Sequence, residues 1–158
     1  KYGFYDERLV RNQDIELNKR IVRGGGHIFI VPDTYCTYLA RETFKGLAKN
    51  NYGNGKWNIL TVHYTKQFKS LSIRHFIPLL FLLSLIVPLL GILFYTPFFY
   101  LSILSLFAYL LALCCVSLRL SARKRLDIFY LLAAFFVLHL SYGYGSLIGV
   151  LNSISDEK

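Results

Sequence analysis

The feature that most constrains this chain is an apolar run from Phe76 to Tyr95 that contains no charged residue. A helix rises about 1.5 Å per residue, so this run is about long enough to cross a hydrocarbon core of roughly 30 Å. A second uncharged run follows from Phe98 to Leu118, and a third apolar run extends from Ile128 to Leu151. We therefore expect a transmembrane region over residues 76–151, with spans at about 76–95, 98–118 and 128–151.

The composition of the chain agrees with a membrane protein. Hydrophobic residues make up 54% of the 158 positions and charged residues only 17%, and the mean hydropathy is +0.42. These values exclude a disordered chain and a purely soluble enzyme. A soluble helical core is the alternative, but it would need three long helices that are each apolar all round.

The basic residues are distributed unevenly. Residues 1–75 hold 13 basic and 6 acidic residues, whereas residues 76–158 hold 5 and 3. Lys66, Lys69 and Arg74 precede the first span, and a basic cluster at 119–125 follows the second. The positive-inside rule places both groups on the cytoplasmic side of the inner or plasma membrane. Because these charges flank spans, we expect membrane lipid and not nucleic acid as a partner.

The first 56 residues have the pattern of a soluble α/β domain. Asn12 to Arg23 is helical in pattern, with Asn12 or Asp14 able to cap its start. His27 to Val31 has the branched, alternating pattern of a short strand. Glu42 to Asn51 is predicted as a second helix that ends at the glycine-rich stretch 53–55. Residues 57–75 carry apolar side chains at helical spacing among basic ones, which predicts an amphipathic segment on the membrane surface.

Asp14 is the candidate with the clearest chemical argument. At a helix start, free backbone N–H groups and the helix dipole stabilise an ionised carboxylate, and a general base must be ionised. Glu16 points to a different side of the same helix, so the two carboxylates do not form an acid–base pair. Judged by itself, an Asp in a first helical turn is more often a simple cap.

Several short blocks carry a resemblance to a known family. They are Gly3 to Glu7, Arg11 to Asn18, Arg20, Gly25-Gly26, Pro32, Tyr38, Arg41 and Tyr52 to Lys56. In this combination the chain resembles the end of the catalytic domain in family 2 glycosyltransferases of the GT-A fold. The likeness is to membrane-bound members that build exopolysaccharide or O-antigen, such as the succinoglycan type.

The resemblance implies an inverting sugar transfer in which Asp14 is the catalytic base. Asp14 would accept the proton of an acceptor hydroxyl as that oxygen attacks the anomeric carbon of a nucleotide sugar. Gln13 stands where the commoner pattern has Glu, so this chain retains the base but lacks the preceding carboxylate. The fold class it implies is a C-terminal piece of an α/β GT-A domain, residues 1–56, followed by the three-helix membrane region.

Tyr52, Gly53, Lys56 and Trp57 lie where related processive synthases keep a Gln-x-x-Arg-Trp motif near the acceptor and the diphosphate. A glycine-rich turn lets backbone approach a ligand, Lys56 could neutralise phosphate, and Trp57 could stack on a sugar ring. A basic surface segment resting on lipid headgroups, with Trp57 in the interfacial belt, is the alternative. Together with Gln13, these four residues are the predicted substrate-binding set.

The resemblance also sets the expected cofactor and partners. A divalent cation, Mg²⁺ or Mn²⁺, is expected in the full-length enzyme, with ligands outside this chain, which has no metal-ligand spacing of its own. The expected partners are a nucleotide-sugar donor and a lipid-linked or polysaccharide acceptor, with the catalytic part cytoplasmic. The alternative is a non-enzymatic three-span membrane anchor or transport subunit with a basic cytoplasmic segment.

Overall fold

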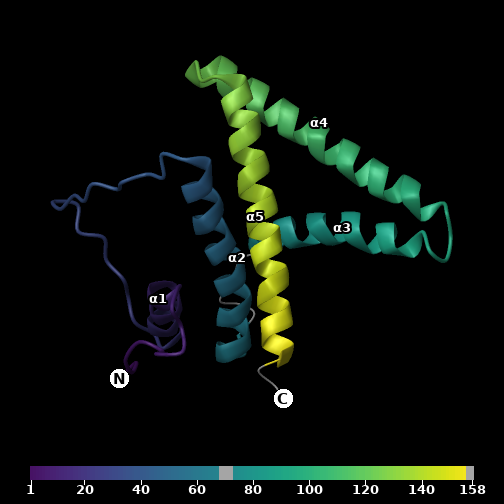
Figure 1. Cartoon of the computed structure of the whole chain (residues 1–158). Helices are drawn as coiled ribbons and strands as arrows, with labels where there is room; N and C mark the ends of the chain where they lie inside the picture. The colour runs from purple at the N-terminus through teal and green to yellow at the C-terminus, as the bar shows by residue number, and fades with distance from the viewer. Residues whose placement is uncertain (68–72, 156–158) are drawn as a thin grey trace.

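The computed structural model describes residues 1–67 and 73–155, and within these ranges every regular element is helical. Figure 1 shows a long pair of helices, α2 and α5, with the short helix α1 on one side and the α3–α4 hairpin on the other. The elements are α1 (Gln13–Arg23), α2 (Phe44–Thr65), the 3₁₀ turn η2 (Ile73–Phe76), α3 (Ile77–Gly91), α4 (Phe98–Lys124) and α5 (Ile128–Ser155).

The expectation of three helices long and apolar enough to cross a membrane is confirmed. They cover Ile73–Gly91, Phe98–Lys124 and Ile128–Ser155, with mean hydropathies of 2.1, 2.4 and 1.6. The first is shorter at its end than predicted, because the chain turns after Gly91, and the other two extend beyond the uncharged runs. This is the architecture of a multi-pass membrane protein.

Helices α2 and α5 lie side by side and run in the same direction (Figure 1). The ring of Phe44 lies 5.0 Å from that of Tyr130 near the start of both helices. Further along, Gly145 lies against the backbone of Tyr52, and Gly149 against that of Lys56. Small residues at this spacing let two helix backbones approach closely, which multiplies dispersion contacts along the pair.

Helices α3 and α4 form the hairpin that the close spacing of the two apolar runs predicts. Ser84 and Ser105 share a hydrogen bond of 2.5 Å, and the hydroxyl of Ser102 donates to the carbonyl of Leu85 at 3.1 Å. Hydroxyl bonds of this kind join helices in lipid, where apolar side chains gain little by leaving the surrounding hydrocarbon. Gly143 of α5 lies against the carbonyl of Pro78 and so connects the hairpin to the α2–α5 pair.

The prediction of an α/β GT-A piece is wrong for the chain as described. Residues 1–67 form two helices and connecting loops, and the predicted strand at 27–31 is an extended segment without strand pairing. Phe29 and Ile30 on it are 84% and 92% exposed. A strand is stable only when neighbouring strands satisfy its backbone groups. The described residues supply no such neighbour, so local β-propensity is not sufficient here.

The glycine-rich stretch 53–55 does not end a helix, contrary to the sequence-based expectation. Helix α2 begins after Thr43, whose hydroxyl accepts from the backbone N–H of Gly46 at 3.1 Å, and runs without interruption to Thr65. Glycine costs a helix up to about 1 kcal/mol, but at Gly55 it permits contact with the backbone of α5. Of the predicted surface segment 57–75, the first nine residues are therefore the end of α2, and residues 68–72 lie outside the described part.

Candidate functional site

An open polar cleft lies where the start of α1 meets α2. Its volume is about 450 Å³, and its lining is mostly polar. The lining residues are Tyr5, Arg11, Asn12, Gln13, Asp14, Arg41, Asn50 and Asn54. One carboxylate faces two guanidinium groups in this cleft, so its net charge is positive and favours an anionic ligand.

Arg11 holds the start of α1 against α2. Its Nη1 donates to Oδ1 of Asn54 at 2.8 Å and to the backbone carbonyl of Asn50 at 3.3 Å. A β-carbon on Gly53 would lie 2.9 Å from Cζ of Arg11, so glycine at this position makes room for the guanidinium. Gly53 therefore contributes to the cleft through its lack of a side chain.

Asn12 orients the first turn of α1. It has a left-handed backbone with φ of 64°, which Asn tolerates better than most residues. Its amide Nδ2 donates to Oδ1 of Asn58 at 2.7 Å, and the carbonyl of Asn12 accepts from the N–H of Glu16 at 2.9 Å. Asn58 in turn donates to the hydroxyl of Tyr142 on α5. A buried hydrogen-bonded network thus connects the cleft to α5.

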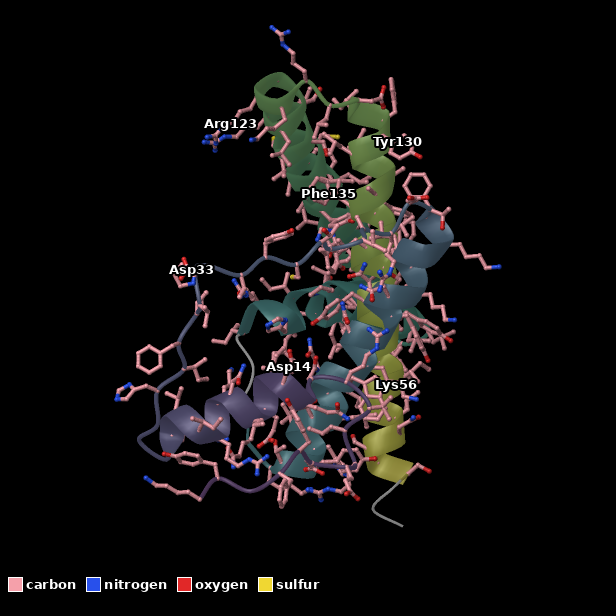
Figure 2. The ribbon with its side chains drawn as sticks, turned by 90° about the vertical axis from the view of Figure 1, so that its left-hand side faces the viewer. Asp14, Asp33, Lys56, Arg123, Tyr130 and Phe135 are labelled. Carbon is pink, nitrogen blue, oxygen red and sulfur yellow. The ribbon has the colours of Figure 1, made fainter. Side chains whose placement is uncertain are left out.

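Asp14 lies in the first turn of α1 with its side chain exposed toward the cleft (Figure 2). The adjacent Gln13 is half-buried and its side-chain amide donates to the carbonyl of Leu9. No side-chain cap bond closes this helix start, so its backbone N–H groups and dipole act on the Asp14 carboxylate. The carboxylate is exposed at the cleft, so a proton donor that enters the cleft can reach it.

Glu16 is part of the support of α1. Its side chain is only 6% exposed and receives two N–H groups from Arg20, at 2.8 and 3.1 Å. Arg20 also donates to the backbone carbonyls of Tyr2 and Phe4, both at 2.7 Å. Through Arg20, this nearly buried carboxylate holds the N-terminal segment against α1. Asp14, in contrast, is exposed to a ligand in the cleft.

The remaining predicted substrate-binding residues lie on other faces of α2. Tyr52 packs on Tyr144 of α5, with ring centroids 5.8 Å apart, and Lys56 lies against Gly149. Figure 2 shows Lys56 beside α5 and Asp14 at the α1 end. Trp57 is half-buried and does not line the cleft. The structure therefore gathers Gln13, Asp14 and Gly53 and leaves the other three apart.

Six cleft residues were not predicted as binding residues from the sequence: Tyr5, Arg11, Asn12, Arg41, Asn50 and Asn54. Tyr5, Arg11, Asn12 and Arg41 do occur in the blocks that carry the family resemblance, which is the one signal that points to them. Asn50 and Asn54 are four residues apart, and a continuous helix brings them to one face. That face could not be seen while the helix was expected to end at Gly53.

The cleft does not have the donor set of a metal site. Its lining offers one carboxylate among amides and guanidinium groups, whereas Mg²⁺ and Mn²⁺ are bound mainly by carboxylate and other oxygen ligands. Across residues 1–67 and 73–155, no group of three His, Cys, Asp or Glu side chains is placed to hold a metal ion.

No protein-family model, curated protein or solved structure matches the chain.

Proposed function

We propose that this chain belongs to an inverting membrane glycosyltransferase, which transfers a sugar from a nucleotide-sugar donor to a lipid-linked or polysaccharide acceptor. The observation that carries the proposal is the cleft, where the Asp14 carboxylate and the guanidinium groups of Arg11 and Arg41 face one space. The resemblance of the block from Arg11 to Asn18 to family 2 glycosyltransferases supports it independently of the geometry.

In the proposed reaction Asp14 accepts a proton from the acceptor hydroxyl. The oxygen so activated attacks the anomeric carbon, and the bond from that carbon to the donor diphosphate breaks with inversion. The nucleoside diphosphate leaves with the electron pair of that bond. General-base catalysis of this kind is worth about 10²- to 10⁴-fold in rate.

Arg41 is the proposed contact of the leaving diphosphate. Nη1 of Arg11 already donates hydrogen bonds to Asn50 and Asn54. Arg41 makes one hydrogen bond to the described residues, from Nη1 to the carbonyl of Leu39 at 3.2 Å. A guanidinium group binds phosphate oxygens through two parallel N–H groups. Donor-bound Mg²⁺ or Mn²⁺, which the family resemblance implies, would supply further charge neutralisation, and no step here depends on it.

The test is Asp14→Asn in the full-length protein in membranes, given a panel of radiolabelled uridine- and guanosine-diphosphate sugars. Asn keeps the shape and much of the helix-start preference of Asp, so the melting temperature is expected to be unchanged while transfer falls by about 10²- to 10⁴-fold. Asp33→Asn is the matched control, because Asp33 lies on an exposed loop away from the cleft (Figure 2).

Two outcomes would contradict the proposal. Turnover of Asp14→Asn within about twofold of wild type would remove Asp14 as the base, given the size of general-base effects. No transfer by the wild-type protein from any donor of the panel would favour the alternative, a three-span membrane anchor or transport subunit.

A further inference from the structure

Helix α5 (Ile128–Ser155) is long and apolar enough to cross a membrane, but its contacts fix the depth of its centre. Tyr142 lies at that centre. Its hydroxyl is 3.2 Å from Nδ1 of His75, and the next residue, Gly143, lies against the carbonyl of Pro78. His75 and Pro78 are among the first residues of the first candidate span, where the chain enters the membrane. The centre of α5 therefore lies at the membrane surface and not in the middle of the bilayer.

The polar contacts of Tyr142 indicate the same depth. Its hydroxyl accepts a hydrogen bond from Asn58 of α2, and Asn58 accepts one at 2.7 Å from Asn12, at the start of α1. Asn12 lines the polar cleft, and Lys45 and Lys49 of α2 are exposed. If the centre of α5 lay in the middle of the bilayer, these polar and charged groups would lie in hydrocarbon, where each charge is costly. The centre of α5 is instead beside water.

The start of α5 lies at the same membrane surface. Helix α4 ends in Arg123 and Lys124, and Oδ1 of Asp127 accepts the backbone N–H of Tyr130 at 2.7 Å where α5 begins. Because α3 and α4 form a hairpin, the end of α4 returns to the side on which α3 begins, and its basic residues suit the cytoplasmic side. Figure 1 shows α5 as one straight helix. A straight helix whose start and centre, about 21 Å apart, lie at one surface must lie along that surface.

We infer that α5 does not cross the membrane, and that its outer face binds the boundary between headgroups and acyl chains of the cytoplasmic leaflet. That face carries Phe129, Phe136 and Ile154, which are 76%, 42% and 58% exposed and are spaced by about two and five helical turns. A helix in this plane needs a polar face toward water, and the polar helix α2, packed on α5, supplies it. The α3–α4 hairpin, on the side of the α2–α5 pair away from α1, is the part that crosses (Figure 1). This inference does not depend on sugar transfer.

The first test is the side of the membrane from which the end of α5 can be labelled. Ser155, the last residue of α5, is exposed and is replaced by cysteine in the full-length protein without its native cysteines. An impermeant maleimide is applied to intact cells and to inverted vesicles, with cysteines at Arg123 and Thr96 as standards for the two ends of α4. We expect Ser155→Cys to react from the same side as Arg123→Cys. Reaction from the side of Thr96→Cys, or from neither side, would overturn the inference.

The second test measures depth along α5. Nitroxide labels at Phe129 and Phe136 are compared in vesicles of phosphatidylcholine and phosphatidylglycerol, with depth taken from their collisions with oxygen and with a water-soluble nickel chelate. The two positions are separated by about 10 Å of helix, so a crossing helix would place Phe136 about 10 Å deeper, whereas we expect equal depths. Leu111 and Leu118 are the matched control, because they are exposed and equally spaced on α4 and should differ by about 10 Å. A similar difference between Phe129 and Phe136 would overturn the in-plane placement of α5.

Discussion

Gly145 of α5 lies directly against the backbone carbonyl of Tyr52 in α2, so closely that a β-carbon at position 145 would overlap the carbonyl oxygen. The contact is reciprocal, because Gly55 of α2 lies equally close to the carbonyl of Tyr142. Helix α2 is not among the three helices apolar enough to span a membrane. These glycines therefore attach a polar helix, which forms one wall of the cleft, to a membrane helix by backbone contact.

Gly145→Ala is expected to destabilise the α2–α5 pair by about 1–3 kcal/mol, the usual cost of forcing extra volume into a packed interface. The measurement is chemical unfolding in detergent. Gly46→Ala is the control, since the nearest atom to its new β-carbon would be the Thr43 hydroxyl at 3.2 Å, and alanine favours a helix. Equal stability of Gly145→Ala and wild type would mean that the helices do not pack as described.

Lys56→Met is expected to leave sugar transfer within about twofold of wild type, because Lys56 faces α5 and Met preserves its apolar stem. When the Asn152 amide is oriented to pair both of its ends, Nζ of Lys56 donates to Oδ1 of Asn152 at 3.0 Å, so a small loss of stability is expected. Steady-state kinetics in detergent distinguish a structural role of Lys56 from a role in binding phosphate. A large rise in KM for the nucleotide sugar would support the phosphate contact that was predicted from the sequence.

Arg41→Gln is expected to affect substrate binding, and Arg11→Gln is expected to affect stability. Arg41→Gln should raise KM for the nucleotide sugar by about tenfold with an unchanged melting temperature, since it removes a charged contact worth roughly 1.4 kcal/mol. Arg11→Gln should instead lower the free energy of unfolding by about 1–3 kcal/mol, because Arg11 joins α1 to α2. Steady-state kinetics and unfolding of both variants check this, and the reverse pattern would exchange their roles.

Membrane topology can be tested by cysteine labelling in intact cells. In a background without Cys36, Cys114 and Cys115, a cysteine at Arg123 is expected to be protected from an impermeant maleimide, and one at Thr96 to react. Arg123 lies in the basic last turn of α4, and Thr96 lies in the turn between α3 and α4. Labelling at position 123 and none at position 96 would invert the predicted orientation of α4.

The three membrane helices follow from the sequence alone, because length and apolar composition are local properties and helix hydrogen bonds close within a few residues. The start of α1 is equally local: Gln13–Arg23 agrees closely with the predicted helix from Asn12 to Arg23. Asp14 could be identified as a candidate for the same reason, since its place in the first turn is visible in the sequence.

Tertiary structure decided what depends on distant partners. Residues 27–31 have strand propensity, but a strand needs neighbours to satisfy its backbone, and none is present in the described chain. Arg11 and α5 occupy the space that side chains at positions 53 and 55 would fill. Helix α2 continues through Gly53 and Gly55 because these close contacts compensate for the low helix propensity of glycine. That continuity alone turns Asn50 and Asn54 toward Arg11, so the cleft around Asp14 exists only once residues about forty positions apart have packed together.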